Sequence, residues 1–458
     1  MSSEIIFEPF RIKVVEPIRL STEDERRQWL ADAGYNVFLL RSEQVVIDLL
    51  TDSGTAAMSQ EQWAALQAGD ESYAGSKSYF ELEAVAQELF QKRVIIPVHQ
   101  GRAGEHLVFH ELIERGAVVP SNGHFDTTAA NVRDRGGTPL NLPCAAASQL
   151  RTSAPFKGDI DLPALKALLE SHHEQIPFVL MTITNNTGGG QPVSFANLSA
   201  VKELCTEFRK PLIIDGCRFA ENAYFIKMRE HGFADESPKA IAQRVFALAD
   251  IVTFSGKKDA LSNIGGLVCL YDEELAERLK NRLVVTEGFS TYGGLAGRDL
   301  AAMAQGLREV VEPSYLHYRI RTIEWMVERL DRAKVPVLIP AGGHGLYIDA
   351  AAFFTHLSPE QFPGIALVNE LYLRGGIRAV ELGNVAFGST DESGKPQFPP
   401  HDLVRLAMPR RVYTEAHAGY VVEIILSLFR QATQVRGYRF VKEAPVLRHF
   451  RSTFAPLD

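Results

Sequence analysis

The sequence predicts an α/β fold: a large domain with a mostly parallel sheet covered by helices on both faces, and a smaller α+β domain. Two patterns predict it. Before Glu312, short apolar runs alternate with segments whose apolar residues recur at helical spacing, which is typical of strands connected by helices. After Glu312, one long helical segment precedes several short strand-like runs. We therefore expect the large domain to span residues 56–312 and the small domain to combine residues 1–55 with 313–458.

Each element is predicted from its own apolar pattern. In the first 55 residues we expect a helix at 22–33, strand-like runs at 37–40 and 45–50, and a polar turn at 51–55. The expected strands of the large domain span 94–98, 178–183, 212–215, 251–254 and 267–271, and its expected helices span 80–91, 103–114, a segment starting near 197, and 219–231. In the small domain, a long helix precedes strand-like runs at 337–339, 345–348, 377–380 and 403–408.

Composition limits the classes of partner. The 458 residues are 46% hydrophobic and 23% charged, as in ordinary globular proteins. A net charge of −8, without a basic tract, argues against nucleic-acid binding. No apolar stretch is long enough to span a bilayer and the N-terminus has no apolar signal core, so we expect no membrane partner. The cysteines form no C-x-x-C pair, which favours a reducing, cytoplasmic location over a zinc site or a disulfide framework: Cys144, Cys205, Cys217 and Cys269.

Polar side chains follow four of the predicted strands. They are Gln100, Asn186, Asp215 and Lys258. In parallel sheets, ligands bind beyond the carboxyl ends of the strands. We therefore expect these four residues to meet at one site.

The pair Lys257–Lys258 is the strongest chemical signal, because it lies between the apolar runs 251–254 and 267–271. Burial disfavours the charged form of an amine, and a neutral amine is suited to forming a Schiff base with an aldehyde. Ser255 could hold a phosphate oxygen through its hydroxyl. By themselves, the same residues are equally compatible with a surface turn that carries two solvated lysines.

Other residues match the needs of pyridoxal 5'-phosphate, which requires a lysine, a carboxylate opposite its pyridine nitrogen, phosphate donors and a flat stacking partner. Lys258 and Asp215 could supply the first two. Gln100, Gly101 and Arg102 open a predicted helix, whose N-terminus suits a phosphate.

The ring itself could contact two more side chains. Phe125 could stack on it, and Arg218 could lie near its phenolic oxygen. Each residue also has an ordinary alternative role: a helix N-cap for Asp215, a strand-to-helix turn for residues 100–102, a core position for Phe125 and a helix surface for Arg218.

Motifs over nearly the whole chain resemble the β-eliminating lyases. Besides the lysine segment, they are residues 8–13 (EPFRIK), 49–55 (LLTDSGT), 69–76 (GDESYAGS), 189–194 (GGQPVS), 221–226 (ENAYFI), 292–295 (YGGL), 377–381 (IRAVE) and 447–450 (LRHF). The resemblance implies a fold-type I enzyme, similar to aspartate aminotransferase, with a seven-stranded sheet and pyridoxal 5'-phosphate as cofactor. It also implies a homotetramer with active sites at dimer interfaces and an amino acid as the small-molecule substrate.

The resemblance implies a role for each matching residue. Lys258 would form the Schiff base and remove the substrate's Cα proton, with Lys257 beside it. The other implied cofactor contacts are Gln100, Gly101, Arg102 and Ser255 for the phosphate, Phe125 for stacking, Asp215 for the pyridine nitrogen, and Asn186 and Arg218 for the phenolic oxygen.

Further roles concern the substrate and a metal ion. Arg405 would grip the substrate carboxylate, near Thr51, Ser53 and Asn186. Tyr73, supplied by the neighbouring subunit, would act as general acid on the leaving group. A potassium ion would be held by the Glu71 side chain and by the backbone carbonyls of Gly54 and Asn263.

Three positions favour L-tryptophan as the substrate, cleaved to indole, pyruvate and ammonia. Family members that act on tyrosine carry an arginine at the position of Leu382, whereas indole has no hydroxyl for an arginine to bind. Asp126 could accept the indole N–H, and His449 could close the pocket or relay protons, so both are implied catalytic residues. Alternatively, Asp126 caps the segment after it and His449 is a packed residue.

Some segments depart from the family pattern. Residues 187–190 carry an extra glycine, and 129–143 and 384–400 differ from the common pattern or vary within the family. A lyase for tyrosine or for S-substituted cysteines therefore remains an alternative. A catalytically silent protein on the same fold is a second alternative, but it would be expected to lose Lys258, Asp215 or Arg405, and all three are present.

Overall fold

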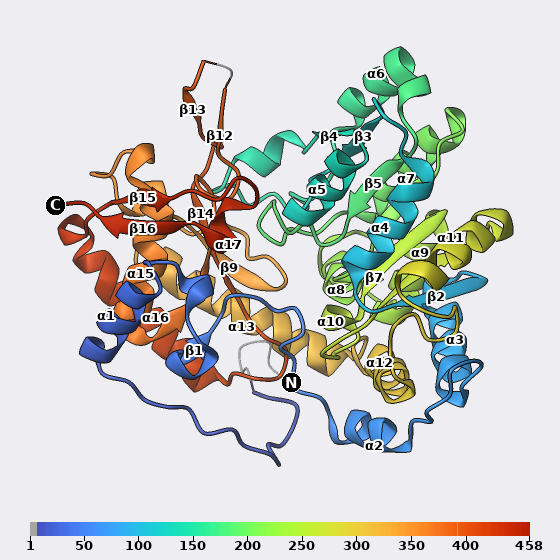
Figure 1. The fold of residues 1–458 in the computed structure, drawn as a ribbon, viewed down its shortest axis with the longest axis horizontal. Coiled ribbons are helices and arrows are strands. Elements are labelled where there is room, and N and C mark those ends of the chain that lie inside the picture. The colour runs from blue at the N-terminus through green and yellow to red at the C-terminus, as the bar shows by residue number, and fades with distance from the viewer. Residues whose placement is uncertain (1–6, 392) are drawn as a thin grey trace.

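The structure is a computed structural model that describes residues 7–391 and 393–458 (Figure 1). Residues 1–6, which begin the predicted small-domain segment, and residue 392, within 384–400, lie outside the described residues. One half of the molecule contains a large sheet covered by helices, and the other contains smaller sheets beside three long helices. The predicted α/β class is confirmed.

A seven-stranded sheet, in the order β2-β8-β7-β6-β5-β3-β4, forms the centre of the larger half. The pairs from β7 to β4 are parallel, whereas β8 runs antiparallel to both of its neighbours. The sheet is therefore mostly parallel, as predicted. Its strands are β2 (Val94–Val98), β3 (Val118–Ser121), β4 (Thr138–Asn141), β5 (Val179–Thr182), β6 (Leu212–Asp215), β7 (Ile251–Ser255) and β8 (Gly266–Leu270).

Helices cover both faces of this sheet because its central strands are apolar on both sides. Successive side chains point to opposite faces, so Ile213 of β6 packs in one core while Leu212 and Ile214 pack in the other. One face carries α4 (Gly101–Leu112), α5 (Asp126–Asp134) and α11 (Glu273–Thr286). The other carries α3 (Lys77–Phe90), α6 (Leu162–His172), α7 (Phe195–Glu207), α8 (Phe219–Arg229), α9 (Pro238–Leu248) and α12 (Gly297–Glu309), and α2 (Gln60–Ala68) packs on α12.

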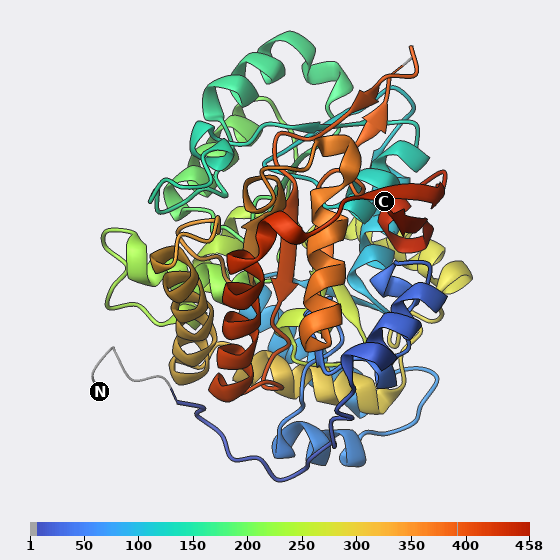
Figure 2. The same cartoon turned by 90° about the vertical axis from the view of Figure 1, so that its left-hand side faces the viewer.

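The smaller half is built on the antiparallel sheet β11-β14-β9, in which Arg405 of β14 lies opposite Val380 of β11. Helices α13, α16 and α15 lie side by side next to it (Figure 2). The bounds are β9 (Gly345–Asp349), β11 (Val380–Leu382), β14 (Leu403–Ala407), α13 (Pro313–Arg332), α15 (Pro363–Gly375) and α16 (Glu415–Arg430). The remaining elements are α1 (Glu23–Asp32), β1 (Ile47–Asp48), α14 (Ala350–Phe353), β10 (Ile377–Arg378), β12 (Ser389–Thr390), β13 (Pro396–Gln397), β15 (Tyr438–Lys442), α17 (Arg448–Arg451) and β16 (Thr453–Pro456).

Helix α13 belongs to both hydrophobic cores. Its first half contributes Leu316 and Ile320 to the core of the large sheet, and its second half contributes Ile323 and Leu330 to the core of the smaller half. The two halves are thus joined by packing. The division into 56–312 and 1–55 plus 313–458 stays a prediction.

Four predicted strands differ in the structure, and of residues 45–50 only Ile47–Asp48 form a strand, β1. Residues 37–40 contain a 3-10 helix (Val37–Leu39), because the Asn36 side chain accepts the Phe38 N–H at 3.0 Å and caps a turn. Residues 337–339 form only an isolated bridge from Val337 to Ile348, since proline at 336 and 340 cannot donate to a ladder. Residues 377–380 split between β10 and β11, which belong to different sheets. Among the described helices, none is both long and apolar enough to cross a membrane.

Candidate active site

A cavity of about 260 Å³ lies at the carboxyl ends of the parallel strands, between the two halves of the chain. Its lining combines residues of the large sheet with residues of β11 and β14 and of the segments around Thr51 and His449. Most of the predicted site residues line it: Thr51, Ser53, Gln100, Gly101, Arg102, Phe125, Asp126, Asn186, Asp215, Arg218, Ser255, Lys257, Lys258, Leu382, Arg405 and His449. The expectation that residues following different strands meet in one place is therefore confirmed.

The two lysines enter the cavity from the end of β7. This strand is buried along its whole length, and at Gly256 the chain turns into the single helical turn α10 (Gly256–Asp259). Both lysines are half-buried. Burial, together with the positive charges of Lys258 and Arg102, lowers the pKa of Lys257. The structure contradicts the alternative of a surface turn with two fully solvated lysines.

Asp215 lies at the end of β6 and is buried, with an ion pair to no described residue. Its Oδ1 accepts the Cys217 N–H at 3.1 Å. A second carboxyl group, Glu105 of α4, lines the same cavity and accepts the Thr128 hydroxyl at 2.7 Å. Burial and the nearby Asp215 raise the pKa of Glu105 to about 7. The two acids favour a cationic partner in the cavity, because an unpaired buried carboxylate is costly.

The start of α4 forms another wall. Gln100 is its N-cap residue but makes no side-chain capping bond, so the first turn is open to an acceptor from the cavity. Gly101 lies against β7: a Cβ at this position would be 2.8 Å from the Ser255 Cβ. The side chain of Arg102 is exposed at the same corner. A helix N-terminus, a hydroxyl and a guanidinium together suit an anion such as a phosphate.

Arg405 occupies the opposite wall. It is 5% exposed and makes an ion pair with no described carboxylate. Its Nη1 donates to Asn186 Oδ1 at 2.9 Å and its Nη2 to the Leu50 carbonyl at 3.1 Å, while Nε is buried without a partner. A buried guanidinium without a counter-ion, beside a cavity, suits a carboxylate ligand.

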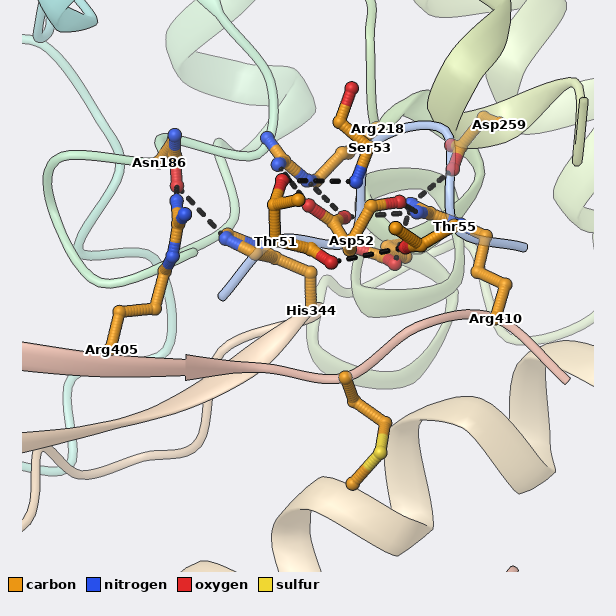
Figure 3. Close-up of polar contacts among 12 residues, drawn as sticks. Thr51, Asp52, Ser53, Thr55, Asn186, Arg218, Asp259, His344, Arg405 and Arg410 are labelled. Carbon is orange, nitrogen blue, oxygen red and sulfur yellow. Dashed lines mark hydrogen bonds and ion pairs between the residues drawn. The ribbon is translucent and has the colours of Figure 1, made fainter. Parts of the chain in front are cut away.

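Asn186 is held with its oxygen toward the protein. Its Oδ1 also accepts the Tyr347 hydroxyl at 3.2 Å. The same oxygen lies 2.9 Å from His344 Nε2 (Figure 3). Burial and the nearby Arg218 keep the pKa of His344 well below its usual value, so this imidazole is neutral. With three neighbours around the oxygen, the Asn186 amide nitrogen is the atom left to face the cavity.

Asp126 and His449 form the last wall of the cavity. His449 Nε2 lies 3.3 Å from Asp126 Oδ2, and both side chains are buried. His449 also packs on Phe38 and Phe450, so α17 closes the cavity. Asp126 accepts the Thr127 N–H as well, but the N-cap residue of α5 is Phe125, so Asp126 does not take its alternative role as the cap. Leu382 lines the cavity as a buried apolar residue.

Four predicted residues lie outside the cavity lining. Tyr73 is 70% exposed and packs on Phe289 and Tyr292. Glu71 pairs with Arg298 on the surface at 2.9 Å. Gly54 and Asn263 are neighbours, because the Asn263 amide donates to the Gly54 carbonyl at 3.1 Å. The described residues hold no cluster of three acidic, histidine or cysteine side chains suited to a metal.

Sequence reasoning missed three buried residues at the site. They are Glu105, Asp52 and His344. Glu105 could have been found from its position one helical turn after Gly101. Asp52 gave a weaker signal, a carboxylate between two residues already assigned to the substrate. His344 follows no strand end, and no local pattern indicates it.

Comparisons with known proteins agree with this geometry. The sequence profile of the family described as beta-eliminating lyase matches residues 48–424. The chain is 53% identical to the tryptophanase of Rhodobacter capsulatus, covering 99% of both chains, and 52% identical to that of Hyphomonas neptunium, with the same coverage. It is 43% identical to the tyrosine phenol-lyase of Symbiobacterium thermophilum, covering 98% of this chain and 99% of that one.

A solved structure, from a complex of SepCysS with the SepCysE N-terminal domain, shares the fold. It superposes with a TM-score of 0.56 at 14% identity, covering 85% of this chain and 96% of that one. The predicted fold class is thus confirmed. From its sequence along its whole length, the chain belongs to the β-eliminating lyase family.

Proposed function

We propose that the protein uses pyridoxal 5'-phosphate to split L-tryptophan into indole, pyruvate and ammonia. One observation carries the proposal: a cavity with two lysines and an unpaired buried Asp215 on one side, and an unpaired buried Arg405 on the other. These charges suit a cofactor with an aldehyde and a basic ring nitrogen, next to a substrate that carries a carboxylate. The similarity to named tryptophanases supports the choice of substrate.

The residues present fit this cofactor. Lys258 would bind the aldehyde, Asp215 would pair with the ring nitrogen, and Phe125 would stack on the ring. Gln100, Gly101, Arg102, Ser255 and Lys257 would hold the phosphate corner, and Asn186 and Arg218 would contact the phenolic oxygen. When bound, the cofactor withdraws electrons from the substrate's Cα, which makes the Cα proton acidic.

The chain's own side chains would do the remaining work. Arg405, with Thr51, Ser53 and Asn186, would bind and orient the carboxylate. The Lys258 amine would take the proton from Cα. Asp126 and His449 would exchange a proton with the indole ring, and their 3.3 Å contact supports a shared role. General acid–base steps of this kind contribute about 10²–10⁴-fold each.

The pocket wall supports tryptophan over tyrosine. Leu382 is buried and apolar and offers nothing to a phenol hydroxyl. An arginine here would remain unpaired against indole, and an unpaired buried charge would disfavour that substrate. S-substituted cysteines stay the second candidate class, since an apolar wall also accepts their leaving groups.

Three further assignments concern the assembly, a metal ion and the location of the protein. We infer a homotetramer with sites at dimer interfaces, supported by the exposed Tyr73, which would act as general acid in a neighbouring subunit. We also infer a potassium site involving Glu71 and the backbone carbonyls of Gly54 and Asn263, supported by the contact between the last two residues. A cytoplasmic location is in keeping with four free cysteines.

To test the function, the purified protein is assayed in parallel with L-tryptophan, L-tyrosine and S-methyl-L-cysteine, and pyruvate release is measured. We expect the highest kcat/KM with L-tryptophan. In Lys258→Ala, pyruvate release and the visible absorbance band of the bound cofactor should both be lost. Comparable efficiency with L-tyrosine would overturn the substrate assignment, and wild-type protein that binds no pyridoxal 5'-phosphate would overturn the cofactor.

A further inference from the structure

A buried carboxylate, Asp52, lies between two residues of the cavity wall. Its neighbours Thr51 and Ser53 line the cavity, whereas Asp52 is 0% exposed and its side chain contacts Arg218 and Arg410 (Figure 3). It accepts hydrogen bonds from Arg218 Nε at 2.9 Å, Arg218 Nη2 at 2.7 Å and Arg410 Nη1 at 2.9 Å. One carboxylate therefore binds two arginines.

The two bonds from Arg218 to Asp52 fix the orientation of the Arg218 guanidinium. Asp52 occupies Nε and Nη2, so Nη1 is the only Arg218 nitrogen without a partner among the described residues. Arg218 is itself buried and lines the cavity. A guanidinium is planar, so two bonds along one edge determine where its third nitrogen points.

The second arginine ties the same loop to the lysine segment. Arg410 is fully buried and donates to Asp259 Oδ1 at 2.8 Å as well as to Asp52. Asp259 follows Lys258 in α10, and its Oδ2 accepts the Ala220 N–H of α8 at 2.8 Å. The loop at Thr51, the helix that carries Arg218 and the turn that carries Lys258 are thus joined through Asp52 and Arg410.

We propose that Asp52 is a positioning residue that holds Arg218 toward the cofactor and the Thr51–Ser53 loop toward the substrate carboxylate. The proposal rests on the cofactor assigned above. It gives Asp52 a role in ligand binding although its side chain touches neither ligand. A purely structural role would instead make Asp52 one of several carboxylates that neutralise buried arginines.

Glu221 provides the matched control. It is also buried, and its Oε1 accepts Arg410 Nη2 and Arg319 Nε, each at 3.1 Å. It makes no hydrogen bond to Arg218 and does not belong to the 51–53 loop. Asp52→Asn and Glu221→Gln make the same change, carboxylate to amide, in the same cluster of charges.

To test this, the apoproteins of wild type, Asp52→Asn and Glu221→Gln are titrated with pyridoxal 5'-phosphate. The cofactor-loaded proteins are then titrated with L-alanine, which has the substrate carboxylate but no leaving group. We expect Asp52→Asn to weaken cofactor binding by about tenfold relative to Glu221→Gln, because coupled neighbours in one network show effects of this order. L-Alanine binding should fall as well. Both variants should lose thermal stability to a similar degree, which the melting temperature measures.

A double-mutant comparison separates an effect through Arg218 from a general loss of stability. In an Arg218→Met background, Asp52→Asn should change cofactor affinity by less than about twofold, because the side chain through which it acts is gone. Equal cofactor affinity in Asp52→Asn and Glu221→Gln would overturn the inference, as would an undiminished effect of Asp52→Asn in the Arg218→Met background. Wild-type protein that does not bind the cofactor would instead overturn the proposed function.

Discussion

At the scale of single residues, the site is defined by charges that lack partners. Arg405 has no carboxylate among the described residues, and Asp215 has no cation. Both are buried, and burying an unpaired charge is unfavourable. Such charges indicate where a ligand of opposite charge binds.

Arg405→Lys should weaken substrate binding. A lysine keeps the charge but loses the planar fork that contacts Asn186 and a carboxylate together. Breaking such a buried pair costs about 2–5 kcal/mol, so we expect kcat/KM for L-tryptophan to fall on the order of 30-fold or more. Arg411→Lys is the control, because Arg411 pairs with Glu309 outside the cavity. Equal kinetics in the two variants would contradict the role of Arg405.

Glu105 should make the apoprotein less stable as pH rises. Burial and Asp215 raise its pKa from 4.5 to about 7 in the folded chain. Folding therefore favours the protonated acid. Its contribution to the free energy of unfolding is fully present below pH 4.5 and is lost as the pH rises through 7. We expect the free energy of unfolding of wild type, relative to Glu105→Gln, to fall by about 2 kcal/mol between pH 5 and 8 in urea titrations. A constant difference would contradict the pKa shift.

At the scale of elements, the phosphate corner depends on the contact between α4 and β7. Gly101→Ala would place a Cβ 2.8 Å from the Ser255 Cβ, so the start of α4 must move away from the strand. We expect the affinity of the apoprotein for pyridoxal 5'-phosphate to fall at least about tenfold, since a loss of about 1.4 kcal/mol is sufficient. Gly419→Ala, in α16 with no atom closer than 3.9 Å, is the control and should bind normally. Cofactor affinity measured by absorbance compares the two, and unchanged affinity in Gly101→Ala would contradict the assignment.

At the scale of the whole molecule, α13 packs in both cores, so we expect the two halves to unfold as one cooperative unit. Ile320 packs in the core of the large sheet and Ile323 in the core of the smaller half. Replacing either by alanine should cost about 2–5 kcal/mol and should lower a single unfolding transition measured by calorimetry. Val285→Ala, at an exposed position on α11, should change stability by about 0.5 kcal/mol or less. Two separate transitions, each sensitive to one of the isoleucines, would contradict this view.

Five strands of the large sheet can be predicted because they are apolar on both faces and are separated by clear helical patterns, whereas β3 and β4 are missed, and the β4 sequence TPLN is half-exposed and carries no apolar run. Most of the cavity can be predicted because its polar residues lie at strand ends: Asp215 ends β6, and Asn186 lies in the loop just after β5. Leu338 and Phe38 show the limit. The first lies in a proline-flanked segment and the second in a turn capped by Asn36, and both patterns look like strands when only apolar content is considered. Asp52, Glu105 and His344 escaped prediction because their importance arises from contacts between residues far apart in the chain.

The unpaired Arg405 has a consequence for how the free protein behaves in storage and assay. A guanidinium that lies ready for a carboxylate does not distinguish sharply between a substrate and a small anion of similar shape. Acetate, formate or citrate in a buffer should therefore occupy this wall, raise the melting temperature of the resting protein and compete with the amino acid, whereas chloride at equal ionic strength should do so far less. The choice of buffer ion then becomes a direct probe of this wall of the cavity.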